Sequence, residues 1–243
     1  MIELIHRHPV LIKILLTVVT VTFIGGGGWL LGKEDVANYA AKVGKDKVTM
    51  DEYQDAVYRM EDFYRKIYKG NMPPDVMKSL DVSKRALDAL IEKRLVLREA
   101  EKEGLEATES EVKDAIKDNG NFQGEGGGFD KERYLETLKA NNMTPAQYEG
   151  AKKEELTVAR FTNLVKDSVY VGDDEVKNYY KEQLAPQKKE YKEDEYQAQK
   201  ENLRRMLTAT AQESAWRSFI DTLRKNSKIE INPHLASEAK ASS

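Results

Sequence analysis

The chain of 243 residues contains no cysteine and only three histidines. The missing thiols exclude disulfide bonds, thiolate metal sites, cysteine nucleophiles and a lipid anchor, which is attached to a cysteine. His6 and His8 precede a long apolar run, and His234 lies close to the C-terminal end. The globular part between them therefore lacks the imidazole that Ser-His-Asp hydrolysis, histidine zinc sites and histidine acid–base catalysis need.

Signals for nucleotide and nucleic-acid binding are also weak. The formal net charge is −3, so the chain offers no basic footprint for nucleic acid. The glycine-rich stretch at 124–128 lacks the Gly-Lys-Ser/Thr ending of a phosphate-binding loop, and Asp130 after it would repel a phosphate. The adjacent Asp173 and Asp174 begin a predicted helix, where they complement its dipole. We therefore expect a protein that is not an enzyme and needs no metal or cofactor.

One segment, Val10 to Leu31, is long and apolar enough to cross a membrane. As a helix it spans roughly 33 Å, about the thickness of a bilayer core. Arg7 and Lys13 lie at its N-terminal end. The positive-inside rule therefore places residues 1–9 in the cytoplasm, a single transmembrane anchor at 10–32 and the rest of the chain outside. A cleaved signal peptide is the alternative, although the run is long for one and lacks a clear cleavage site.

The remaining chain reads as nearly all helical with a minor sheet. Three capping boxes predict helix starts, at Thr49-Met50-Asp51-Glu52, Thr108-Glu109-Ser110-Glu111 and Thr144-Pro145-Ala146-Gln147. Tyr39 to Val48 predicts a short strand pair around Gly44, and Lys228 to Asn232 alternates as one further strand. A long helix is expected over Val82–Glu103 and another before the last strand.

Several of these segments together resemble the N-terminal chaperone region of the SurA/PpiD family of extracytoplasmic foldases. The resemblance rests on Val43 to Tyr53, on Ala86 to Leu95 and on three short blocks in the family's order: Phe122-Gln123, Phe129 to Leu135, and Met143 to Tyr148. It runs from about Val43 to Lys181 and returns from Trp216 to Pro233.

This resemblance implies a mainly α fold. The expected domain is a SurA-N-like helical chaperone domain over 36–233, with a small sheet formed by its N- and C-terminal segments and a disordered tail at 234–243. Family members usually insert parvulin-type prolyl isomerase domains before the closing helix. Here only the short linker 181–195 occupies that interval, so the resemblance implies the chaperone module without isomerase activity.

The resemblance further implies ATP-independent binding of unfolded or nascent secreted and outer-membrane polypeptides. The chain is then held in the inner membrane by Val10 to Leu31 with its body in the periplasm, near the secretion machinery. The alternative is a non-catalytic interaction subunit of one specific membrane or envelope complex.

Adaptable methionine and aromatic side chains suit a surface that binds many partners. They gather in the first two helical segments, and the candidate peptide-binding residues are Tyr58, Met60, Phe63, Tyr64, Tyr68, Met72 and Met77. Such side chains at helical spacing more often form core. Tyr53, Val57, Met60, Tyr64 and Ile67 share one helical face, whereas Tyr58, Phe63 and Tyr68 lie off it.

Overall fold

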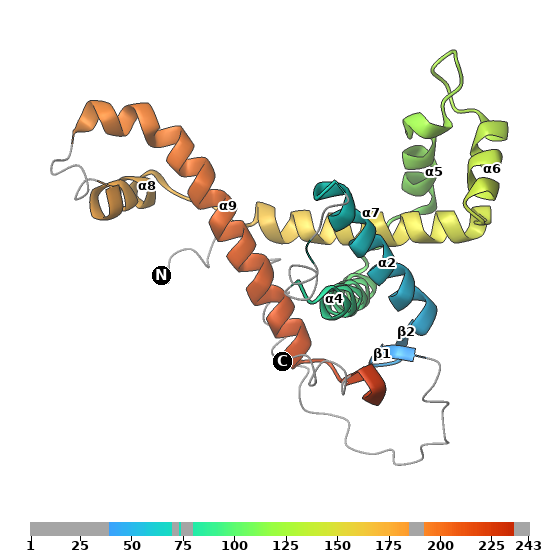
Figure 1. Ribbon diagram of the computed structural model, residues 1–243. Helices are drawn as coiled ribbons and strands as arrows, with labels where there is room; N and C mark the ends of the chain where they lie inside the picture. The colour runs from blue at the N-terminus through green and yellow to red at the C-terminus, as the bar shows by residue number, and fades with distance from the viewer. Residues whose placement is uncertain (1–38, 70–72, 74–79, 185–191, 236–243) are drawn as a thin grey trace. The chain divides into compact units, whose positions relative to one another are not determined.

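A computed structural model describes residues 39–69, 73, 80–184 and 192–235 (Figure 1). The expected cytoplasmic N-terminus and transmembrane anchor lie outside these residues, as do Met72, Met77 and most of the expected tail. Within the described ranges no helix combines the length and apolar character that crossing a membrane requires.

The described chain forms two compact units. The first takes the residues up to Glu99 and those from Ile220 onward, and the second takes Ala100–Phe219. The structure is mainly helical with one small sheet, as the sequence predicts.

The sheet belongs to the first unit and contains β1 (Tyr39–Val43), β2 (Asp46–Thr49) and β3 (Ile229–Ile231). Its order is β2-β1-β3, and both pairs are antiparallel. The expected strand pair and the expected joining of N- and C-terminal segments in one sheet are therefore confirmed. The buried Asn232 fixes this closure, because its backbone N–H donates to Ala40 O at 3.0 Å and its side-chain amide donates to Tyr39 O at 2.7 Å.

The turn between β1 and β2 depends on Gly44. Its φ is +61°, in the left-handed region that favours glycine. Its N–H donates to Lys228 O at 2.8 Å, which extends the β1–β3 pairing by one residue. A Cβ at this position would lie 1.6 Å from Nη1 of Arg98, whose guanidinium donates to Val43 O. Glycine therefore leaves room at this turn for the Arg98 guanidinium, which any side chain at position 44 would displace.

Two helices complete most of the first unit. The helix α2 (Met50–Ile67) starts at the predicted capping box of Thr49 and Glu52, and α4 (Val82–Glu103) buries Ile91 and Leu95. Arg94 of α4 donates to Glu52 at 2.6 Å, which ties the first turn of α2 in place.

The end of α9 (Glu193–Lys225) also belongs to the first unit and contributes the buried Ile220 and Leu223. Its Arg224 donates to Asp88 at 3.2 Å and Glu92 at 3.1 Å, both on α4. These charge-assisted bonds fix the last turn of α9 beside α4.

In the second unit, α5 (Glu109–Lys117), the 3₁₀ turn η3 (Gly120–Phe122), α6 (Lys131–Ala140) and α7 (Pro145–Asp167) share one core. The capping boxes predicted for α5 and α7 are both present, and Asp130 caps α6. Figure 1 shows the antiparallel α5 and α6 beside one end of α7. The glycine-rich stretch forms the expected loop, which is closed by a bridge between Gln123 and Phe129.

A second cluster of the same unit joins α8 (Asp173–Tyr179), the π-helical turn η4 (Tyr180–Leu184) and the first half of α9. Its buried residues are Val171, Val176, Tyr180, Tyr196 and Leu203. Asp173, in the first turn of α8, accepts from Lys200 at 2.6 Å and from Arg204. The acidic start of α8 therefore binds cations of α9 in addition to complementing its own dipole.

Candidate functional site

The second half of α2 carries apolar side chains that the fold leaves uncovered. Phe63 and Ile67 are each 58% exposed, and Tyr68, just after the helix, is 41% exposed. Met60 and Tyr64 are partly buried, and the rings of Phe63 and Tyr64 meet edge to face at 5.6 Å. We call Met60, Phe63, Tyr64, Ile67 and Tyr68 the α2 apolar surface.

At about 100° per residue these five residues lie within an arc of roughly 140°, so Phe63 and Tyr68, which were predicted to lie off the face of Met60, Tyr64 and Ile67, flank it on either side. Tyr58 is 67% exposed but lies on roughly the opposite side. The structure thus brings Met60, Phe63, Tyr64 and Tyr68 together and separates Tyr58 from them.

The exposure of this surface arises from how α2 is anchored. Its first turn is held by the buried Tyr53 and by the Glu52–Arg94 ion pair, and the helix then extends from the sheet (Figure 1). The sequence places Ile67 on the same face as Tyr53, yet Tyr53 is buried and Ile67 is exposed. Ile67 was therefore missed as a surface residue, because spacing shows which residues share a face but not how far along the helix that face is covered.

The polar side of α2 is already neutralised by its own ion pairs. Arg65 contacts Glu61 at 3.3 Å, and Lys66 contacts Asp62 at 2.6 Å. The Asp62 carboxylate raises the pKa of Lys66 above its ordinary value by accepting its hydrogen bond. The second half of α2 therefore presents one apolar side and one charged side, which is the pattern of a helix that binds an apolar partner.

The second unit exposes further large apolar side chains that the sequence did not single out. They are spread over separate elements: Phe129, Leu135, Leu164, Tyr170 and Met206. Their spacing shows no common helical face, so sequence periodicity gave no signal for them.

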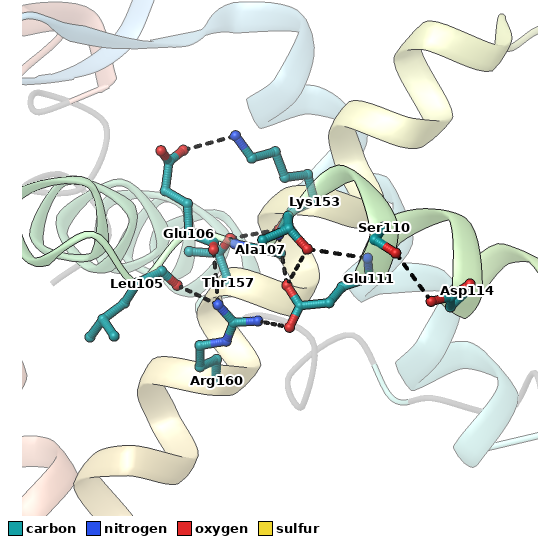
Figure 2. Close-up of polar contacts among 10 residues, drawn as sticks. Leu105, Glu106, Ala107, Ser110, Glu111, Asp114, Lys153, Thr157 and Arg160 are labelled. Carbon is teal, nitrogen blue, oxygen red and sulfur yellow. Dashed lines mark hydrogen bonds and ion pairs between the residues drawn. The ribbon is translucent and has the colours of Figure 1, made fainter.

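A polar cluster of the second unit joins α5 to α7 and is structural (Figure 2). Arg160 of α7 donates to Leu105 O at 3.3 Å, to Glu106 O at 2.9 Å and to the Glu111 carboxylate. Thr157 is buried and accepts the N–H of Ala107 at 2.9 Å. A single turn of α7 thereby satisfies the backbone of the segment that leads into α5.

Electrostatics in this cluster follow from the same bonds. The hydrogen bond from the Thr108 N–H, followed by those from Arg160 and the Thr108 hydroxyl, lowers the pKa of Glu111 to about 2. The bonds from Lys200 and Arg204 likewise hold the pKa of Asp173 below its ordinary value. The Glu111 shift comes first from its own capping box and then from Arg160, and the Asp173 shift comes from ion pairs with α9, so both report structural contacts and not a poised acid or base.

Four aromatic rings pack together in the second unit. Phe122 meets Tyr134 at 5.0 Å and Tyr148 at 5.4 Å, and Phe129 lies 5.7 Å from Tyr134. Burial raises the pKa of Tyr134. These rings belong to the three short sequence blocks that carry the family resemblance. In the structure they hold η3, α6 and α7 together.

Comparison with known proteins gives the family of this chain. The family model described as the SurA-like N-terminal domain matches residues 1–162. The chain belongs to the SurA-like N-terminal domain family. Two curated relatives are the periplasmic chaperone PpiD of Escherichia coli K12 and that of an E. coli O6:H1 strain, each 29% identical over 168 residues. The alignments cover 65% of this chain but only 26% of either relative, so the chain spans about a quarter of their length.

The family match includes the α2 apolar surface and most of α7, including Arg160. It ends before α8, α9 and β3. The uncovered half of α2 therefore lies in the part of the chain that defines membership of the SurA-like family.

Proposed function

We propose that this chain is a membrane-anchored chaperone that works outside the cytoplasm and binds unfolded or newly translocated polypeptides without ATP. Membership of the SurA-like family supports the chaperone role, and the relatives are named periplasmic chaperones. Anchoring is supported by the apolar run at 10–31, which lies outside the described residues. An anchor would raise the local concentration of the binding surface for chains leaving the membrane.

The observation that carries the proposal is the α2 apolar surface. Phe63 and Ile67 each leave more than half of the side chain in water. Covering a Phe or Ile side chain completely stabilises a complex by about 1.5–3 kcal/mol, so covering the exposed part contributes about 1–2 kcal/mol for each. Such contacts need no particular partner sequence, which suits the capture of many unfolded chains.

The proposal includes no prolyl isomerase activity. The interval between η4 and α9 is short, since η4 ends at Leu184 and α9 begins at Glu193. The sequence between His8 and His234 contains no histidine. In the related foldases the isomerase belongs to inserted parvulin domains, for which this interval leaves no room.

The test measures suppression of client aggregation by the full chain in phospholipid nanodiscs. Several unfolded proteins are diluted from denaturant at a one-to-one ratio, with empty nanodiscs as the blank. We expect the chain to delay light scattering and the double variant Phe63→Ser/Ile67→Ser to lose most of this effect. The matched control is Leu135→Ser/Tyr170→Ser, which removes two exposed apolar side chains of the second unit.

Each outcome decides the proposal. No delay for any client refutes the chaperone function, and a single stable partner recovered from membranes would then favour the dedicated interaction subunit. Equal loss in both double variants would show that the α2 apolar surface is not the binding site. Turnover of a proline-containing peptide by the purified chain would refute the non-catalytic assignment.

A further inference from the structure

Among the described residues, no strand pairs with the outer edge of β3. The β1–β3 register pairs Val43 with Ile229 and Ala41 with Ile231. Gly44 N–H donates to Lys228 O, and Asn232 N–H donates to Ala40 O. Hydrogen-bonded pairs alternate along an antiparallel ladder. The backbone N–H and C=O groups of residues 228, 230 and 232 therefore point toward β1, and those of Ile229 and Ile231 point away from it.

The two edges of the sheet differ. At the β2 edge, the carbonyl oxygen of Lys47 accepts from Arg94 Nε at 3.4 Å. At the β3 edge, no hydrogen bond within the described residues uses the outward N–H and C=O groups of Ile229 and Ile231. Ile231 is also 43% exposed. An edge with free backbone groups beside an apolar side chain is a template for another strand.

We propose that this edge binds an extended segment of the client polypeptide as a fourth, antiparallel strand. The inference rests on the proposed chaperone function and specifies how one part of a client is bound. Residues directly opposite each other share a face of the sheet, so apolar client residues would lie beside Ile229 and Ile231. The residue between them would lie beside Glu230 and its ion pair with Lys228 at 2.6 Å, so a polar residue fits there. The preferred client segment therefore alternates apolar and polar residues.

The size of the edge favours a client over a second copy of this chain. A three-residue strand paired with its own copy would bury far less than the roughly 1,200 Å² of a stable interface. Such a pair centred on Glu230 would also place two carboxylates directly opposite each other. A long client instead reaches a second contact in the same unit, because α2 follows directly from β2 at the other edge of the sheet. Two weak contacts on one flexible chain reinforce each other.

The decisive probe is a nine-residue peptide of alternating valine and lysine, tested against the full chain in nanodiscs. In the proposed pairing the valine N–H groups point toward β3 and the lysine N–H groups point away. N-methylation of two central valines should weaken binding by roughly 5-fold for each blocked hydrogen bond. The matched control is N-methylation of two central lysines, which should leave the affinity within about 2-fold. Hydrogen exchange should show new protection of the Ile229 and Ile231 amides when the unmodified peptide is bound.

The outcomes separate this inference from the chaperone function itself. Aggregation suppression with equal effects of both methylation patterns, or with no added protection at Ile229 and Ile231, overturns strand addition and leaves the chaperone proposal standing. Concentration-dependent protection of these amides without peptide would show that a second copy occupies the edge, which also overturns the proposal. Failure to suppress any aggregation refutes the function on which the inference rests.

Discussion

Replacing Gly44 with alanine should destabilise the first unit through two separable effects. The left-handed φ of +61° costs an alanine about 1–2 kcal/mol. The new Cβ would also lie 1.6 Å from Nη1 of Arg98, so the guanidinium must move. Moving it breaks a charged hydrogen bond to Val43 O, which is worth about 1–2 kcal/mol at this partly exposed site. The expected loss of stability is therefore about 2–4 kcal/mol.

The two effects can be measured separately by a double-mutant cycle. In an Arg98→Ala background, Gly44→Ala should cost only the conformational part, about 1–2 kcal/mol. Gly104→Ala is the matched control, because Gly104 has φ +67° but a Cβ there would meet no atom within 4 Å. It should cost the same 1–2 kcal/mol in either background.

The assay is urea denaturation followed by circular dichroism, with hydrogen exchange of the β1 amides to locate the change in the first unit. A cost of Gly44→Ala that is the same with and without Arg98 would refute the reasoning, since the displaced guanidinium would then contribute nothing. A cost below that of Gly104→Ala would refute the conformational part as well.

Two further predictions concern the second unit. Because the folded-state pKa of Glu111 is about 2 against an ordinary value of 4.5, its contribution to stability is complete above about pH 4.5 and is lost as the pH falls toward 2. The melting-temperature difference between the wild type and Glu111→Gln should therefore shrink over that range, and a constant difference would contradict the assignment. Thr157→Val leaves the buried N–H of Ala107 without its acceptor and should cost about 1–3 kcal/mol by urea denaturation. The control is Thr137→Val, because the Thr137 hydroxyl donates to Arg133 O in its own helix; it should cost less than about 0.5 kcal/mol, and equal costs would contradict the role of Thr157.

Helix starts were predictable from the sequence because their cause is local. In each capping box the Thr hydroxyl accepts the N–H three residues later, and the side chain there accepts the Thr N–H in return. The tight turn at Gly44 was predictable for the same reason. These interactions span three or four residues. All the residues that form them are therefore visible together in one short stretch of sequence.

Contacts between distant residues could not be predicted in this way. Arg160 binds Glu111 from 49 positions along the chain, and nothing in the spacing of either residue marks the other as its partner. The candidate site shows the same limit. Periodicity grouped Met60, Tyr64 and Ile67 on one face of the helix, but the length over which that face is covered depends on where the sheet and α4 end.

The position of the α2 apolar surface explains how it stays open without weakening the fold. The first turn of α2 is secured by its capping box and by Arg94, whereas the exposed side chains lie three or more turns further along. Side chains that are more than half in water contribute less to folding than buried ones, so replacing Phe63 or Ile67 with serine should cost only about 1 kcal/mol. The exposed part of their apolar area then remains available for binding. The first turn of α2 anchors the helix, and its later turns carry the exposed side chains. A Phe63→Ser/Ile67→Ser variant that stays folded but no longer suppresses aggregation has therefore lost a contact with the client and not its structure.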